Sequence, residues 1–248
     1  MRIWEALGRM MGGISAPFTT LGSLTRNARL FHPDGALYWA RVQPIAKDGM
    51  LGELAKRLEG PALVRLSSAW WRNEKEWPDI LGIAIRFVEI KKANAPGPPP
   101  RDQDLLFATI RRTLTLPIAP LSTNTHDFMA NDYFALLPFE VEGIGRAMFR
   151  LLPMRLPKQS GKRREKLEAR IAAGTAVFRI EMKKAIPGSK WKEIASVELR
   201  EPAQIDQNDI AFNPFRAGRG IVPTGLVQMI RAATYPASVL GRTLIPKG

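Results

Sequence analysis

The chain has 248 residues, of which 45% are hydrophobic, and this is enough for one large domain with a sizeable core. It contains no cysteine, which excludes disulfides, zinc–thiolate sites, iron–sulfur clusters and thiol catalysis. It contains two histidines, His32 and His126, so a multi-histidine metal site is not expected. Lysine and arginine outnumber aspartate and glutamate by 37 to 23, and the formal charge of +14 favours anionic partners: nucleic acid, membrane or substrate.

The N-terminal segment, residues 1–25, is amphipathic. It carries Glu5 and lacks the long apolar run of a signal peptide. No stretch of about 18 apolar residues occurs in the chain, so no transmembrane helix is expected. We therefore expect a cytoplasmic protein. Peripheral contact with an anionic membrane surface is kept open on the basis of charge alone.

Short strands are the next elements in chain order. Four segments are rich in β-forming residues and partly alternate between apolar and polar side chains: 36–46, 61–67, 81–90 and 104–110. A proline-rich loop separates the last two, because proline cannot donate a ladder hydrogen bond. Short strands at this spacing predict a mainly antiparallel sheet or barrel.

The second half of the chain mixes helices and strands. We predict a helical region at 127–152, a helix at 161–173, strands near 176–185 and 195–201, a loop at Gly218 and Gly220, and a last helix at 224–243. No internal repeat or domain boundary is visible. The predicted architecture is α+β, with one domain over residues 1–248 in which helices pack around an antiparallel β-barrel.

The densest charge lies in residues 158–170, where Glu165 and Glu168 are mixed into a basic run. This mixture is typical of the solvated face of a helix, with membrane or nucleic-acid contact as the lesser option.

The last predicted helix carries a pattern that fits a haem ligand. Tyrosine binds haem iron as a phenolate, and its ordinary pKa is about 10, so a nearby cation is needed to favour the ionised form. Arg231 lies four residues before Tyr235 and would share its helix face, and Arg242 would follow two turns later. Pro236 would bend this helix. Arginine and tyrosine four residues apart also occur on ordinary amphipathic helices, so this pattern does not decide alone.

Further segments carry a resemblance when taken in order. Arg29 and His32 form an Arg-x-x-His that leads through Gly35 into a strand. Residues 62–68 contain Val-Arg-Leu-Ser, and residues 79–87 follow the pattern Asp-x-x-Gly-x-Ala-x-Arg-Phe. In this order the segments resemble the catalase superfamily over residues 26–243. The resemblance matches Arg65 and Ser67 to the family's Val-Arg-Phe-Ser strand, and Leu81 stands where the family has arginine.

Two more segments extend the resemblance. Residues 123–128 are similar to the family's Asn-Asn-Thr-Pro-x-Phe and would make Asn124 the distal asparagine, with 105–122 as an insertion. A competing alignment places Thr109 at that position. Residues 211–214 precede Arg231, Tyr235 and Arg242, which keep the catalase spacing.

The resemblance implies a catalase-like haem barrel that binds haem b. It implies that Tyr235 is the ligand of ferric iron and that Arg231 tempers the charge of the phenolate. His32 would transfer the proton of a bound hydroperoxide, Ser67 would support His32, and Asn124 would stabilise the leaving oxygen. The propionate partners would be Arg29, Arg65 and Arg242. Phe134 and Leu136 are both candidates to face the ring.

The chain also departs from large catalases. Phe31 stands where the family has a smaller valine, and the additions beyond the haem domain are missing, as in a group that includes organic-peroxide-dependent peroxidases and allene oxide synthases. We therefore expect a haem peroxidase with weak catalase activity, which uses hydrogen peroxide or an organic or lipid hydroperoxide and an organic electron donor. The alternatives are a fatty-acid hydroperoxide lyase or allene oxide synthase-like enzyme, and a non-enzymatic haem-binding protein. No specific nucleic acid is expected, and a homodimer is kept open.

Overall fold

The computed structural model describes residues 35–71, 75–89, 101–111, 118–135, 138–205 and 210–224. The strands in this part are β1 Gly35–Pro44, β2 Gly60–Ser68, β3 Leu81–Phe87, β4 Gln103–Ala108, β5 Tyr133–Phe134, β6 Phe139–Val141, β7 Gly145–Pro153, β8 Val177–Lys184, β9 Lys192–Pro202 and β10 Ile221–Pro223. The helices are α2 Gly49–Leu58, α3 Ala119–Ser122, α4 Arg163–Ala172 and a 3₁₀ turn, η2, Phe128–Ala130.

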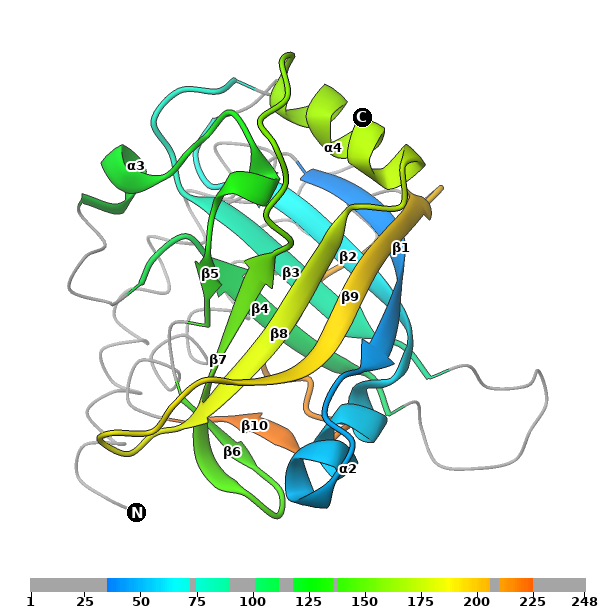
Figure 1. Ribbon diagram of the computed structural model, residues 1–248, viewed down its shortest axis with the longest axis vertical. Coiled ribbons are helices and arrows are strands. Elements are labelled where there is room, and N and C mark those ends of the chain that lie inside the picture. Colours follow the sequence, from blue (N-terminus) through cyan, green and yellow to red (C-terminus); the bar gives the residue numbers. More distant parts are fainter. Residues whose placement is uncertain are drawn as a thin grey trace, which may run out of the picture.

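The strands close into a barrel (Figure 1). Their order in the sheet is β10-β6-β7-β5-β4-β3-β2-β1-β9-β8, and every pairing is antiparallel. A further pairing joins β7 to β8, so the eight strands from β7 through to β8 in this order form a closed ring. Strands β6 and β10 extend the sheet beyond β7. The predicted antiparallel barrel is confirmed. The α+β class is met only loosely, because the helices of the described residues are few and short.

The barrel interior is filled by its own side chains. Alternate residues of each strand point inward, and the largest of the fully buried ones are the aromatic residues Tyr38, Tyr133, Phe87, Phe149 and Phe178. An eight-stranded barrel has an interior just wide enough for side chains to fill. The interior therefore has no room for a large planar ligand.

The two ends of the barrel are covered by different helices. Helix α2 buries Leu54, Ala55 and Leu58 in the main core at the lower end in Figure 1. This helix was not predicted. Its apolar residues at helical spacing fill the space left where β1 turns back into β2.

Helix α4 covers the opposite end and confirms the predicted helix at 161–173. It is solvated over most of its surface, but two of its arginines face the barrel, which the charge pattern did not indicate. Arg163 Nη1 donates to the Thr125 carbonyl at 2.8 Å, and Arg170 Nη1 lies 3.0 Å from Asp127 Oδ1. Both arginines are buried. They are part of the packing of α4.

The predicted helical region at 127–152 is wrong. Its described residues form η2, β5, β6 and most of β7. In β7 the side chains of Ala147, Phe149 and Leu151 are buried, and those between them are more exposed. This alternation has the two-residue period of a strand. The segment forms a strand because β5 and β6 pair with one edge of it and β8 with the other.

The amphipathic segment 1–25 and nearly all of the predicted helix 224–243 lie outside the described residues. Among the helices that the structure does describe, none is long and apolar enough to cross a membrane.

Candidate functional site

A strip of small side chains crosses the outer face of the barrel from β1 to β5. The strand register places Gly35 opposite Ser67, Ser67 opposite Gly82, Gly82 opposite Ala108, and Ala108 opposite Phe134. Four neighbouring strands therefore present glycine, serine, glycine and alanine in one row, with a phenylalanine at its end. Glycine within a strand often marks a place where a ligand or another backbone approaches closely. The strip therefore places only short side chains on this part of the outer face, and Ser67 within it is buried.

Arg65 lies beside this strip in the next row, between Leu37 and Ala84. Its side chain is buried, with 5% exposure. The guanidinium lies over Gly35: a Cβ atom at Gly35 would be 2.6 Å from Arg65 Cζ. The absence of a side chain at Gly35 is thus what allows a buried cation at the edge of the strip. Arginine is almost never fully buried unless an anionic or hydrogen-bonding group compensates it.

Apolar side chains surround Arg65 on the same face. Leu37, Leu63 and Phe212 form a cluster that is separate from the barrel core, and Trp39 and Leu106 pack against it. The strip, this apolar cluster and the buried Arg65 therefore lie together on the outer face of β1–β4, where β3 and β4 also carry Arg86 and Asp104.

The two candidates for the distal polar residue lie on adjoining segments. Thr109 directly follows β4 at the end of the strip, and its hydroxyl accepts the Leu81 N–H at 3.1 Å and shares a 2.8 Å hydrogen bond with the Thr123 hydroxyl. Asn124 directly follows Thr123 and is exposed. Its side-chain oxygen accepts the His126 N–H at 3.0 Å, which makes a local Asx turn. Both residues stay candidates, with Thr109 adjoining the strip.

The loop that carries Asn124 is held from two sides. Asn131 brackets Asn124, because its amide oxygen accepts the Asn124 N–H and its amide nitrogen donates to the Asn124 carbonyl, each at 2.8 Å. Glu76 accepts the Arg163 N–H at 2.5 Å and contacts His126 Nδ1 at 2.6 Å. Thr125 Oγ1 donates to the Glu76 carbonyl at 2.9 Å. Glu76 therefore joins the β2–β3 connection to this loop and to the start of α4.

Acid is expected to weaken this junction. Burial raises the pKa of Glu76, but the hydrogen bonds from the Arg163 N–H and His126, together with the charges of these two residues, bring the net pKa below its ordinary value. A lowered pKa in the folded state gives stability above the unfolded pKa that is lost as the pH falls through the folded pKa. We expect the free energy of unfolding to fall between about pH 5 and about pH 3, and to fall less in Glu76→Gln. Urea denaturation across this pH range measures the free energy of unfolding of the wild type and of Glu76→Gln. Glu140→Gln, at an exposed position, is the control. Parallel curves for wild type and Glu76→Gln would contradict this role.

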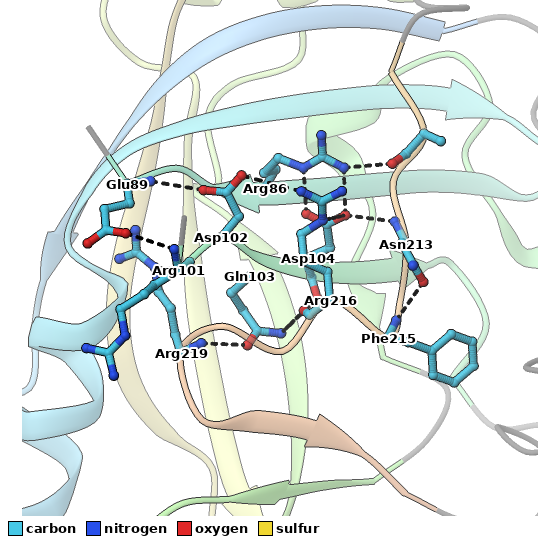
Figure 2. A network of polar contacts seen from close by, with 11 residues as sticks. Arg86, Glu89, Arg101, Asp102, Gln103, Asp104, Asn213, Phe215, Arg216 and Arg219 are labelled. Carbon is cyan, nitrogen blue, oxygen red and sulfur yellow. Dashed lines mark hydrogen bonds and ion pairs between the residues drawn. The ribbon is translucent and has the colours of Figure 1, made fainter. Parts of the chain in front are cut away.

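A network of polar contacts ties residues 211–219 to β3 and β4 (Figure 2). Its centre is Asp104, a carboxylate with no solvent exposure. Arg86 binds it with two parallel hydrogen bonds of 2.8 and 2.9 Å, and the Asn213 N–H donates to it at 2.7 Å. Arg216 Nε lies 3.6 Å from the same carboxylate. Arg86 also donates to the Ala211 carbonyl at 2.7 Å.

The network continues toward β10. Gln103 donates to the Arg216 carbonyl at 2.8 Å and accepts the Arg219 N–H at 3.3 Å. The Arg219 guanidinium donates to the backbone carbonyls of Arg57, Glu59, Val88 and Arg101. Gly218 passes so close to β4 that a Cβ atom there would be 2.5 Å from the Asp102 carbonyl oxygen. The segment is therefore fixed against the barrel immediately before the chain reaches residues 225–248.

The sequence did not reveal this network. The available signal was an arginine and an aspartate on neighbouring strands, Arg86 and Asp104, whose register sets them directly opposite each other. Of the predicted site residues, Arg65 and Ser67 lie together on the outer face, and Asn124 lies in the loop beyond its end. The remaining ones are outside the described residues: Arg29, His32, Arg231, Tyr235 and Arg242.

The barrel is similar to that of a solved protein. The crystal structure of a fungal catalase matches with a TM-score of 0.61 and 11% sequence identity, over 90% of this chain and 61% of the catalase chain. No family model and no curated protein matches the sequence. The chain thus has a catalase-like fold and spans about three fifths of the length of that catalase. At this identity the likeness concerns the fold.

Proposed function

We propose that this protein binds haem b against the outer face of β1–β4 and uses it to metabolise hydroperoxides. The observation that carries the proposal is the buried Arg65 at the edge of a flat strip of small residues on a catalase-like barrel. The two acidic propionates of haem suit a buried guanidinium, because charge-assisted hydrogen bonds to carboxylates are strong and short. The planar ring suits a row of glycine, serine and alanine, whose side chains are short.

Tyr235 is the iron ligand in this proposal. The chain has three tyrosines. Tyr38 and Tyr133 are in the barrel core with 1% and 0% exposure, and burial raises the pKa of Tyr133 far above its ordinary value, which keeps its phenol neutral. Tyr235 remains as the residue that could supply a phenolate, and Arg231 would stabilise the negative charge. Arg29 and Arg242 would join Arg65 in binding the propionates.

His32 and a polar group on the distal side would handle the proton. Haem with a phenolate ligand supplies an iron centre that favours cleavage of a hydroperoxide O–O bond. A neutral His32 would take the proton from the oxygen that binds and return it to the oxygen that leaves. Asn124 or Thr109 would stabilise charge on the leaving oxygen, and Ser67 would orient His32. The substrates are hydrogen peroxide and organic or lipid hydroperoxides, with an organic electron donor.

The visible spectrum of the haem-supplemented full chain tests the proposal. We expect a Soret band with high-spin tyrosinate features and one haem per chain, and a changed spectrum in Tyr235→Phe. Tyr133→Phe is the matched control, since its hydroxyl donates to the Phe128 carbonyl at 2.8 Å inside the core. Identical spectra for wild type and Tyr235→Phe, or no stoichiometric haem in the wild type, would overturn the assignment.

Product analysis then tests the reaction. Reduction of a hydroperoxide to its alcohol, with matching oxidation of a donor, is the expected result. An isomerised or cleaved lipid without donor oxidation would instead identify a hydroperoxide-rearranging enzyme. Stoichiometric haem without turnover of any hydroperoxide would identify a haem-binding protein.

A further inference from the structure

One end of the barrel has a second, smaller apolar cluster. Ala69 and Ile80, at the two ends of the β2–β3 connection, pack there with Ile110 and Ala119. The Ala69 N–H donates to the Ile80 carbonyl at 2.9 Å, which closes the base of this connection. Helix α3 is thus held against the β2–β3 connection, at the end of the barrel opposite α2 (Figure 1).

Large apolar side chains project from these same two segments. Leu121 is 80% exposed, Ile118 59%, Trp77 54% and Trp70 38%. We call these four residues the tryptophan–leucine patch. They flank the small cluster in sequence, since Trp70 follows Ala69 and the two aliphatic residues lie on either side of Ala119. They make up four of the eight large apolar side chains that are exposed among the described residues. Such a concentration marks an interaction surface more often than scattered exposed residues do.

Basic side chains lie around the patch. Lys75 Nζ is 4.5 Å from the centre of the Trp77 ring. The start of α4 adjoins the patch through Glu76, which accepts the Arg163 N–H. Exposed cations occur on this helix and in the segment before it: Lys158, Lys162 and Arg164.

The acidic groups at this end are engaged in contacts of their own. Glu76 binds His126 and the Arg163 N–H. Glu165 accepts the Lys162 N–H at 2.9 Å, and Glu168 is paired with Arg164 at 3.2 Å. Over residues 75–79, 118–132 and 158–172, seven lysine and arginine residues stand against six aspartate and glutamate residues, so basic residues are in slight excess at this end.

We propose that this end of the barrel docks on an anionic lipid surface, with the tryptophan–leucine patch inserted among the headgroups. Tryptophan is enriched at membrane interfaces, because its ring has an apolar body and a polar N–H. Basic residues add attraction to anionic headgroups, so apolar insertion and charge act together.

Two other occupants fit the patch less well. Trp70 and Trp77 could stack on nucleic-acid bases, but Leu121 and Ile118, the two most exposed residues of the patch, are aliphatic and offer no such ring. A second copy of the chain would bring another +14 against the first, and charges of the same sign repel. An anionic lipid surface satisfies both the apolar and the basic residues.

The position of the patch agrees with the proposed function but does not depend on it. Ser68 alone separates Ser67 from Ala69, and Thr109 alone separates Ala108 from Ile110, so the strip ends beside the small cluster that the patch flanks. Docking would bring the proposed haem site close to the surface from which lipid hydroperoxides are presented. Binding to lipid can be measured without haem turnover.

Co-sedimentation of the full chain with vesicles tests the proposal. We expect binding to phosphatidylcholine vesicles that contain phosphatidylglycerol, weak binding to phosphatidylcholine alone, and a blue shift of tryptophan emission on binding. Leu121→Ser and Trp77→Ala should each weaken binding about tenfold, because each removes one inserted apolar side chain. Ile186→Ser is the matched control: it is 61% exposed but lies in the β8–β9 connection, away from α3 and α4.

Three results would overturn the proposal. One is binding of Leu121→Ser and Trp77→Ala that equals the wild type, which would leave charge alone as the cause. Another is equal loss in Ile186→Ser, which would show that the patch has no special role. The third is a change in oligomeric state of Leu121→Ser, measured by sedimentation velocity without vesicles, which would assign the patch to a second copy. Because Leu121 is 80% exposed, its replacement is expected to leave the fold intact.

Discussion

Asp104→Ala is expected to lower the free energy of unfolding by roughly 3 kcal/mol, because it breaks an ion pair whose carboxylate is buried and whose cation is 13% exposed. Arg86 would lose both of its hydrogen bonds to the carboxylate, and the Asn213 N–H would lose its acceptor. Urea denaturation followed by circular dichroism measures the change. Haem occupancy should fall as well, since residues 211–219 lead directly into the segment that carries Tyr235.

An exposed ion pair provides the control for this prediction. Arg179 and Glu193 are in contact at 2.5 Å, but their side chains are 43% and 40% exposed. Glu193→Ala should therefore change the free energy of unfolding by about 1 kcal/mol or less. If Asp104→Ala cost no more than Glu193→Ala, the buried network would not be what fixes residues 211–219 to the barrel.

Arg65→Met is expected to weaken haem binding about 10- to 100-fold, which corresponds to the loss of one hydrogen bond between charged groups. Methionine keeps much of the length of the side chain and removes the charge that would meet a propionate. Arg65→Lys should recover part of the affinity, because it restores the charge without the planar fork of the guanidinium. Haem titration monitored at the Soret band gives the affinities, and circular dichroism gives the folded fraction for each variant.

Arg41→Met is the matched control for Arg65. Both arginines are on the outer face, two rows apart in the register of β1 and β2, but Arg41 is exposed. Its replacement should leave haem affinity unchanged. Equal affinities for Arg65→Met, Arg65→Lys and the wild type would remove Arg65 from the propionate site and weaken the placement of haem on this face.

The strands of the barrel could be predicted where one face is apolar. The expected strands 36–46, 61–67, 81–90 and 104–110 became β1–β4 with shifts of a few residues at their ends, because alternation survives in the short segment itself. Region 127–152 was misread as helical. Its strands are short or depend on partners far away in sequence, and β5 has only Tyr133 and Phe134. Such a short strand is stabilised mainly by pairing with its neighbours in the sheet, and its own sequence carries little strand signal.

The candidate site could be predicted only in part, for a related reason. Local sequence around Arg65 and Ser67 suggested both residues. The row of Gly35, Ser67, Gly82 and Ala108 became visible with the strand register, which a single segment does not contain. The same holds for Arg86 and Asp104. The roles of His32 and Tyr235 stay predictions, since both residues lie outside the described part.

The pairing of β1 with β9 sets the order in which this chain can fold. Pro44 pairs with Ala195 and Tyr38 with Pro202, so the ring can close only after β1 has paired with β9, which lies about 150 residues later in the chain. Non-local pairings of this kind make folding slow, commonly milliseconds to seconds in β-rich domains, because loop-closure entropy is lost before the contacts form. During synthesis, β1 and β2 leave the ribosome long before β9 and keep an open edge on which other chains could pair. Expression at low temperature or with chaperones should therefore raise the yield of folded protein more than changes to the helices would.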